Sequence, residues 1–524
     1  MNKHNHYDAI VIGAGLNGEW MARGLSEGGL RVLVLDAGPV MKEVDFARTP
    51  KDGILHRARF FLGGHRRIAN APVLNSATQH FYVDERRNPY TFPKEKPFRW
   101  FRGRQVGGRG HTWGRLALRY APEDFQYEAE DGAAWPISYR DLETYYGRVE
   151  EFMLLEGQKD NIDGLPDGCY VRNHELTPTE LHFKMSVEKK WPNRIVIPVR
   201  VLSYPYGPLS PMLQSALDTG RAELRPSMAV DSILMDPEEK RAVGVSCVDC
   251  LAGTRLNFYS DIVVCCASTI ETIRILLNSS SRNHPDGLGN SSGVLGCYVM
   301  DHISFWQIGS TTESSHIAPN WFHLSSDMGV YLPRLRKRQF EDGGFRGTYG
   351  IQGSLGRAGM FWALAALGEM LPKKENRVTL NRKVKDRWGI PAAHIECSYS
   401  QNEKALCADA VRTMQELADA AGFSRSHEFL PLPIRMLSAF VRRTGIISDR
   451  PVPGSSIHES GGVRMGRTEK ESVLNGHNQM WEIPNLFVVD SSCFPTISFQ
   501  NPTLTTMALA LRACDYILSS NFHA

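Results

Sequence analysis

Two side chains near the end of the chain could act together on a hydroxyl group. His458 lies in SIHESGGVRMG and Asn501 in FQNPTLTTMALALRACDYI, both rich in glycine or small residues. A neutral imidazole titrates close to working pH and can take a proton, and a carboxamide can hydrogen-bond a substrate oxygen. Taken alone, a histidine in such a position more often hydrogen-bonds within a core, and Asn501 could cap a helix that starts after Pro502. Their role therefore depends on the rest of the chain.

A glycine-rich turn near the N-terminus supplies that context. Residues 7–12 are apolar and β-branched, which predicts a buried parallel strand. This strand leads directly into Gly13, Gly15 and Gly18. In dinucleotide-binding proteins such glycines allow a tight turn, the close approach of a pyrophosphate and the packing of helix on strand. The turn is therefore a candidate nucleotide site.

The elements after the glycines complete this motif. A helix beginning with Leu16 and Asn17 would direct its first N–H groups at the phosphates. A second apolar strand, 32–35, ends in Asp36, at the spacing of a carboxylate that binds ribose hydroxyls. A glycine turn in some other α/β protein is the weaker interpretation. The motif leaves NAD and FAD open, but with the imidazole and carboxamide it suggests a flavin enzyme that oxidises alcohols.

Length and charge narrow the class of protein. A chain of 524 residues exceeds one ordinary domain, and a net charge of +3 gives no case for binding nucleic acid or a membrane. Only six residues precede the strand that begins at Tyr7, so we expect no signal peptide and a cytoplasmic location. The apolar run 360–371 is too short to span a bilayer and predicts a buried helix.

Ten cysteines in so long a chain do not suggest a disulfide framework. Cys247 and Cys250 form a CxxC, but no second pair or nearby histidine has zinc spacing. Adjacent Cys265 and Cys266 lie in a buried-strand pattern and are expected in the core. No metal site is predicted.

The middle of the chain alternates between short strands and turns. The predicted strands are 229–235, 242–251, 255–258 and 262–267, followed by a helix at 271–277. This pattern predicts a β-meander that returns to a central strand of the nucleotide-binding sheet. We place most of a substrate-facing sheet within 303–450.

Several motifs together carry a resemblance over nearly the whole chain. They are the glycine turn, VGGRGHTWGR at 106–115, the strand ending at Ala267 and Ser268, NLFVVDSSCFPT at 485–496 and NPTLTTMALA at 501–510. With these motifs the chain resembles the glucose-methanol-choline (GMC) oxidoreductases. The motif GGRGHTWGR and the segments 131–146 and 376–391 further resemble the pyranose oxidases and the bacterial glycoside 3-oxidases or 3-dehydrogenases.

The resemblance implies an α/β fold, in which a Rossmann-like FAD-binding domain is interleaved with a substrate domain built on a mostly antiparallel sheet. The expected FAD-binding segments are 1–50, 95–150, 222–302 and 451–524. The expected substrate segments are 51–94, 151–221 and 303–450.

The resemblance also implies a mechanism, in which the hydroxyl proton leaves to a base while a hydride passes from carbon to flavin N5. His458 matches the family's base, and Asn501 matches the second active-site position, where its amide would hold the substrate oxygen. Asp490 is expected near the flavin or its ribityl chain, although a turn residue at a strand end is nearly as good an interpretation. Besides Asp490 and the N-terminal motif, the implied cofactor contacts are Arg104, Gly107, Gly108, His111, Thr112, Trp113, Ala267, Pro502 and Thr503.

One position departs from the pyranose oxidases, whose flavin is covalently attached. Their linking histidine stands four residues after the second glycine, where this chain has Thr112, and His111 comes one residue early. We therefore expect His111 to be a hydrogen-bonding neighbour of a non-covalent FAD.

The expected activity is oxidation of a secondary alcohol on a sugar or glycoside, with oxygen or another electron acceptor reoxidising the flavin. A primary-alcohol oxidase acting on a non-sugar natural product and a flavin-fold lyase are the alternatives. A non-catalytic flavoprotein is disfavoured by the presence of both His458 and Asn501. An NAD dehydrogenase is disfavoured because nothing in that fold needs the C-terminal motifs. A homo-oligomeric state is left open.

Overall fold

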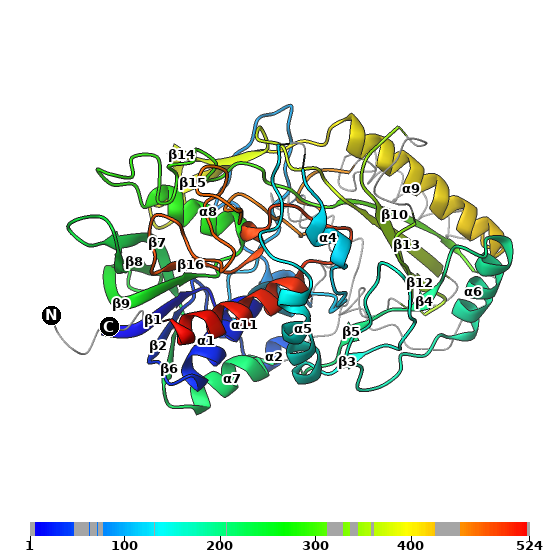
Figure 1. Ribbon diagram of the computed structural model, residues 1–524, viewed down its shortest axis with the longest axis horizontal. Helices are drawn as coiled ribbons and strands as arrows, with labels where there is room; N and C mark the ends of the chain where they lie inside the picture. The colour runs from blue at the N-terminus through cyan, green and yellow to red at the C-terminus, as the bar shows by residue number, and fades with distance from the viewer. Residues whose placement is uncertain are drawn as a thin grey trace.

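Two β-sheets dominate the chain, and each is covered by helices (Figure 1). The fold is described from a computed structural model for residues 6–46, 62, 71, 77–129, 131–205, 207–311, 329–335, 344–357, 361–424 and 451–520.

The larger sheet has seven strands in the order β6-β2-β1-β9-β8-β7, with β16 paired to β9. They are β1 (His6–Ile12), β2 (Val32–Leu35), β6 (Ala222–Arg225), β7 (Met228–Met235), β8 (Ala242–Asp249), β9 (Arg255–Cys265) and β16 (Leu486–Val488). Pairing is parallel among β6, β2, β1, β9 and β16, and antiparallel along β9, β8 and β7. Ile10 of β1 stands level with Leu33 and Val263, and all three are fully buried. A strand with neighbours on both edges and cover on both faces is apolar over its buried length, as residues 9–12 of β1 are.

Helices cover both faces of this sheet (Figure 1). On one side α1 (Leu16–Glu27) packs against α7 (Pro211–Asp218) and α11 (Thr503–Ser519), and α11 packs against α5 (Arg140–Phe152). On the other side α8 (Thr269–Asn278) packs against β7 and against the hairpin of β14 (Arg377–Lys385) and β15 (Pro391–Glu396). The predicted Rossmann-like arrangement is confirmed.

The second sheet has five antiparallel strands in the order β10-β13-β12-β11-β4. They are β4 (Ile197–Pro198), β10 (Ile303–Ser310), β11 (Val330–Leu332), β12 (Tyr349–Leu355) and β13 (Phe361–Gly368). Helix α9 (Gln401–Ala420) packs on β10, β12 and β13, and α6 (Pro178–Lys190) packs on α9 (Figure 1). Trp362 and Leu417 belong to the separate hydrophobic core between these elements. The expected antiparallel substrate sheet is therefore present.

The prediction of a buried helix over 360–371 is wrong, because residues 361–368 form strand β13. This strand is paired on both edges, with β10 and β12, and residues 363–367 include the small side chains Ala363, Ala365 and Ala366. A central strand buried on both faces loses the alternation that marks a half-exposed strand. Periodicity alone therefore could not separate it from a buried helix.

The predicted β-meander is confirmed in β7, β8 and β9, with one difference. The expected strands 255–258 and 262–267 form one continuous strand, β9. Its first half pairs with β8 and its second half pairs with β1 and β16. The polar residues between the two apolar runs suggested that the strand breaks there, but β9 is paired without a break.

The division of the chain into FAD-binding and substrate segments stays a prediction. Two elements from the expected substrate segments pack against helices that cover the larger sheet. Helix α7 packs against α1, and the β14–β15 hairpin packs against α8. The remaining short elements are α2 (Glu43–Phe46), η3 (Gln79–Phe81), η4 (Gly108–Thr112), α4 (Pro122–Gln126), β3 (Leu155–Glu156), β5 (Val201–Leu202) and η6 (Ser491–Cys493). In the part of the chain that the structure describes, no helix combines the length and apolar character needed to cross a bilayer.

Candidate active site

The carboxyl ends of the parallel strands β1, β2 and β9 meet at one edge of the larger sheet. Strand β1 ends at Ile12, whose carbonyl accepts the N–H of Cys266 at 2.8 Å, and Gly13 N–H donates to Leu35 O at 2.7 Å. A Cβ on Gly13 would lie 2.6 Å from Cys266 O, and one on Gly18 would lie 1.8 Å from Gly13 O. These close approaches explain both glycines. They bring the turn, the end of β2 and the segment after β9 together, where open α/β sheets bind ligands.

Gly15 differs from the other two glycines because its surroundings are open. It is the N-cap of α1, with φ −83°, and no side chain in the described residues caps the helix. A Cβ built on Gly15 would meet no described atom within 4 Å. The N-terminus of α1 thus opens onto free space, as a helix must if its N–H groups are to bind a pyrophosphate. This cradle fits the phosphates of FAD.

Asp36 follows β2 and holds the glycine turn. Its carboxylate accepts the N–H of Ala14 at 2.9 Å and the N–H of Gly38 at 2.8 Å. Burial raises the pKa of Asp36, while these two backbone hydrogen bonds oppose the rise. The carboxylate also lines the cavity next to the turn. That it binds the ribose hydroxyls there stays a prediction.

One cavity of about 780 Å³ runs from this edge to the second sheet. The predicted site residues on its wall are Gly13, Gly15, Leu16, Asn17, Asp36, Arg104, Gly108, Thr112, Trp113, Ala267, His458, Asp490, Asn501, Pro502 and Thr503. Gly18, Gly107 and His111 are not on the described wall of the cavity. Phe305, Gln352 and Leu367 line it from the antiparallel sheet. Residues that were predicted from distant parts of the sequence are therefore brought to one cavity.

His458 and Asn501 lie next to each other on this wall. The imidazole Nε2 of His458 is 3.4 Å from Nδ2 of Asn501. Asn501 precedes Pro502, the N-cap of α11, and its Oδ1 is buried without a hydrogen-bond partner among the described residues. Burial, the ring of His302 and the charge of Arg109 hold the pKa of His458 well below its ordinary value. The imidazole is therefore neutral at pH 7 and can accept a proton, although it titrates lower than the sequence suggested.

Asp301 fixes the loop that presents His458. Its buried carboxylate accepts the N–H groups of Gly454 at 2.8 Å, Ser456 at 3.1 Å and His458 at 3.0 Å. Burial first, and then the charge of Glu459, raise the pKa of Asp301 to about 7, and the three N–H groups oppose this rise. Asp301, which lies just before β10, thus fixes the loop that precedes the imidazole of His458.

His302, the next residue, contacts His458 directly. The Nδ1 atoms of the two rings are 2.8 Å apart, and the rings are perpendicular. His302 Nε2 hydrogen-bonds to the carbonyl oxygen of Ser498. Burial lowers the pKa of His302 to about 4, so this ring is also neutral.

An ion pair connects the loop after Gly108 with the His458 loop. Arg109 Nη1 lies 2.5 Å from Glu459 Oε2 and donates to Ile457 O at 3.0 Å, and its Nη2 donates to Ser268 Oγ at 2.8 Å. Glu459 is 1% exposed, and its second carboxylate oxygen has no hydrogen-bond partner among the described residues. Both side chains line the cavity beside His458.

His111 is turned toward the core. Its Nε2 donates to Val106 O at 2.7 Å, and the ring contacts Phe46 and Phe81. Burial lowers the pKa of His111 to about 4. Thr112, which stands where the pyranose oxidases have their linking histidine, lines the cavity instead.

Asp490 makes structural hydrogen bonds at a strand end and also lines the cavity. It caps the short helix η6 by accepting the N–H of Ser492 at 2.9 Å, and it accepts the hydroxyl of Thr272 at 2.6 Å. It also lines the cavity. The turn role at the strand end is therefore present, and a position near the flavin or its ribityl chain stays a prediction.

Four residues around His458 were missed from the sequence: Asp301, His302, Arg109 and Glu459. The adjacent Asp301 and His302 stand just before an apolar strand, a polar pair that could have been noticed. Arg109 lies within the glycine-rich loop at 106–115, but its partner, Glu459, is 350 positions away. No local pattern indicates such a pair.

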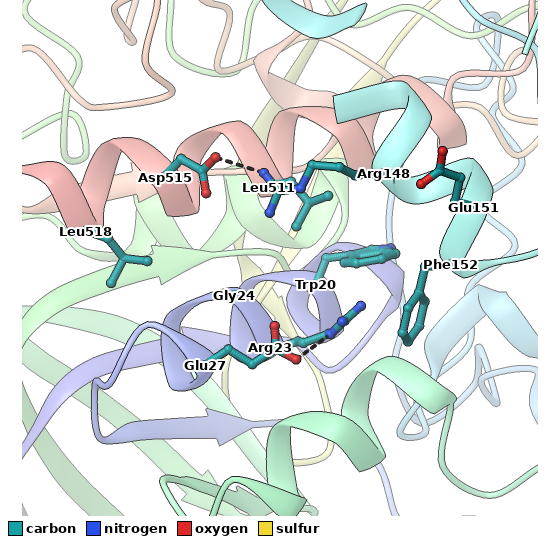
Figure 2. Close-up of a pocket in the computed structure, with 10 residues that line it drawn as sticks. All are labelled: Trp20, Arg23, Gly24, Glu27, Arg148, Glu151, Phe152, Leu511, Asp515 and Leu518. Carbon is teal, nitrogen blue, oxygen red and sulfur yellow. Dashed lines mark hydrogen bonds and ion pairs between the residues drawn. The ribbon is translucent and has the colours of Figure 1, made fainter. Parts of the chain in front are cut away.

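A second pocket lies on the outer face of the helical layer, among α1, α5 and α11 (Figure 2). Its walls carry the ion pairs Arg23–Glu27 at 2.7 Å and Arg148–Asp515 at 2.8 Å (Figure 2). None of the predicted site residues lines it. This pocket therefore holds none of the predicted chemistry.

Known proteins resemble this chain in sequence and in fold. Models of the GMC oxidoreductase family match residues 206–304 and 372–510. A 2-methyl-1,2-propanediol dehydrogenase of Mycolicibacterium austroafricanum is 27% identical, over 97% of this chain and 95% of the relative. The fructose dehydrogenase large subunit of Gluconobacter japonicus is 24% identical over 98% of both chains. A C-glycoside 3-oxidase of Arthrobacter globiformis is 33% identical, over 28% of this chain and 24% of the relative. A solved formate oxidase from Aspergillus oryzae RIB40 shares the fold with a TM-score of 0.71, at 15% identity over 99% of both chains.

Proposed function

Because this chain belongs to the GMC oxidoreductases and is an FAD-dependent alcohol or sugar oxidoreductase, we propose that it oxidises a secondary alcohol of a sugar or glycoside to a ketone. The observation that carries the proposal is the pair formed by His458 Nε2 and the Asn501 carboxamide, 3.4 Å apart on the wall of the cavity. The glycine turn lies on the same wall.

His458 takes the hydroxyl proton at Nε2, because its depressed pKa keeps the imidazole neutral and able to accept. Asn501 donates from Nδ2 to the substrate oxygen and holds it against the imidazole. When bound, FAD would supply the acceptor for the hydride on the carbon that bears this oxygen. The hydroxyl proton would then be held at Nε2 of His458.

The cavity also favours a substrate with several hydroxyl groups. Oδ1 of Asn501 and Oε1 of Gln352 are buried acceptors with no hydrogen-bond partner among the described residues. Both side chains line the cavity, Gln352 from β12. A buried acceptor without a partner costs about 1–3 kcal/mol, which a donating hydroxyl would recover. The similarity to a fructose dehydrogenase subunit and to a C-glycoside 3-oxidase supports a sugar or glycoside.

The proposal includes a non-covalent FAD, since the Nε2 of His111 is hydrogen-bonded to Val106 O. Oxygen or another electron acceptor completes the cycle, in a cytoplasmic enzyme without nucleic-acid or membrane partners. The segments proposed for the FAD-binding and substrate domains are those expected from the sequence.

A second candidate is oxidation of a primary alcohol on a non-sugar compound. The similarity to a 2-methyl-1,2-propanediol dehydrogenase over almost the full length favours it. The two candidates differ in substrate but share the same base and the same cofactor.

The test is anaerobic bleaching of the flavin by a panel of sugars, glycosides, diols and simple primary alcohols, followed by reoxidation in air. Bleaching by sugars or glycosides, with a ketone as product, is expected. Bleaching by primary alcohols alone would favour the second candidate. No bleaching by any alcohol would favour a flavin-fold lyase and refute the oxidation proposal.

His458→Ala provides the matched variant. It should retain FAD and slow flavin reduction by roughly 10²–10⁴-fold, the range for loss of a general base. An unchanged rate would remove His458 from the mechanism.

A further inference from the structure

The hydrogen bonds around His302 determine which of its nitrogens carries the proton. Its Nε2 faces the carbonyl oxygen of Ser498, which can only accept. That nitrogen must therefore carry the hydrogen. A pKa near 4 keeps the ring neutral, so Nδ1 carries a lone pair.

The tautomer of His302 in turn determines the tautomer of His458. Its Nδ1 is 2.8 Å from His302 Nδ1, and a hydrogen bond at that distance needs one donor. Because His302 Nδ1 is an acceptor, His458 Nδ1 must donate. The neutral ring of His458 then has no hydrogen on Nε2, the atom that faces Asn501 Nδ2.

From this chain of contacts we propose that His302 is a positioning residue, which holds His458 in the one tautomer whose Nε2 can take the substrate proton. The proposal rests on the proposed function, because it assigns a purpose to the tautomer only if His458 is the base. In the other tautomer Nε2 would carry a hydrogen toward the substrate oxygen and could not accept one.

Charge around the pair fits this role. When the substrate O–H bond breaks and an N–H bond forms at Nε2, His458 becomes a cation that still donates from Nδ1 to His302. His302 has no second charge to place beside that cation. The charged or titratable groups around the pair include Asp301, which accepts the His458 N–H, and Tyr399, which donates to the His302 carbonyl. Arg109, which pairs with Glu459, also faces it.

Asp301 makes the arrangement rigid. Its carboxylate holds the loop from Gly454 to His458, and His302 is the next residue of the same segment. The hydroxyls of Tyr399 and Ser456 both donate to the His302 carbonyl at 2.9 Å. The position of one imidazole against the other is thus fixed from both sides.

The first test reads the tautomer in the holoenzyme without any change at His302. The protein is labelled with ¹⁵N-histidine, and the His458 signals are assigned by their loss in His458→Gln. We expect a protonated Nδ1 and an unprotonated Nε2 on His458. A protonated Nε2 on the neutral ring would overturn the proposal.

The second test compares two substitutions at His302 by anaerobic flavin reduction. In His302→Asn, Oδ1 falls close to the place of Nδ1 and can accept from His458, so the limiting rate should stay within about tenfold of the wild type. His302→Leu offers no acceptor and should lower the limiting rate by roughly 10²-fold, with little change in the substrate concentration at half-saturation. His394→Leu, on β15 and hydrogen-bonded to Thr91, is the control and should leave the rate unchanged.

The outcomes separate the possibilities. Equal losses in His302→Asn and His302→Leu, together with loss of FAD, would indicate a structural role and overturn the proposal. An unchanged rate in His302→Leu would do the same. If His302→Leu does not fold, the tautomer measured in the wild type still decides. Failure of the proposed function appears separately, as full flavin reduction in His458→Ala.

Discussion

Gly15→Ala tests the assignment of the cofactor cradle. Gly15 has φ −83°, a backbone conformation that alanine adopts freely, and an added Cβ would meet no described atom within 4 Å. The methyl group would, however, occupy the space in front of the first turn of α1. We expect the protein without FAD to keep its fold while FAD binding is weakened.

The expected magnitudes follow from these contacts. Alanine lowers the entropy of the unfolded chain, worth about 0.4–1 kcal/mol, but it is a poorer N-cap than glycine by a similar amount. The two effects nearly cancel in the apoprotein. Hydrogen bonds from N–H groups to a charged phosphate contribute about 1.5–3 kcal/mol each, so losing one or two weakens FAD binding by roughly 10- to 10⁴-fold.

The assay is a thermal unfolding series with increasing FAD, from which both the apoprotein melting temperature and the FAD dissociation constant are obtained. Gly147→Ala is the control. Gly147 lies within α5, far from the turn in sequence, and its added Cβ would lie 3.5 Å from Cys169 Sγ, an ordinary contact. It should leave FAD binding unchanged. Gly18→Ala places a Cβ 1.8 Å from Gly13 O and should disturb the fold itself. Wild-type FAD affinity in Gly15→Ala would show that the pyrophosphate does not bind at this turn.

Four further predictions concern the cofactor, the base and a buried acid. Acid precipitation should release yellow flavin into the supernatant, and flavin left in the pellet would contradict non-covalent FAD. Asn501→Ala should slow flavin reduction less than His458→Ala and keep its pH dependence, whereas His458→Ala should remove the ionisation of the base; the reverse pattern across pH would exchange the two roles. Glu459→Gln removes the anion beside Arg109, so the acid limb of flavin reduction in a pH series should move to lower pH, and a shift to higher pH would contradict the charge assignment. Burial raises the pKa of Glu19 to about 8, so the wild type should lose stability relative to Glu19→Gln between about pH 5 and 8, by roughly 1.4 kcal/mol per pH unit in thermal unfolding.

The sign of the Glu19 effect follows from proton release. The folded protein holds this proton up to about pH 8, whereas the unfolded chain releases it near the ordinary pKa of a glutamate, so rising pH favours unfolding across that window. Glu27→Gln, on the same helix but exposed, is the matched control for replacing a glutamate by glutamine there. Parallel curves for Glu19→Gln would show that the carboxyl is ionised in the folded state.

The sequence predicted what local patterns encode. Strand β1, the glycines, α1, β2 and Asp36 follow one another within 36 residues, and each step has its own residue pattern. Strand β13 was mistaken for a helix because both its faces are buried and its run of small residues has no alternation. His302 could not be assigned a role, since its partner His458 is 156 positions away and the contact depends on how two loops meet. Asn501 and His458 could be proposed as the reacting pair only because the motifs around them resemble a family.

The pairing of β1 has a consequence for how the chain is made. As a nascent chain leaves the ribosome, its first strand has β2 nearby, but its other neighbour, β9, is synthesised about 250 residues later. Helix α11, which packs on α1, is among the last described elements to emerge. Contacts of such long sequence separation form slowly, and until they form the apolar strands remain unpaired on one edge. The cavity that FAD would occupy is lined by residues at the start of α11 as well as at the start of α1, so we expect it to be complete only once α11 has been synthesised, and a chain that stops short of α11 lacks the helix that packs on α1.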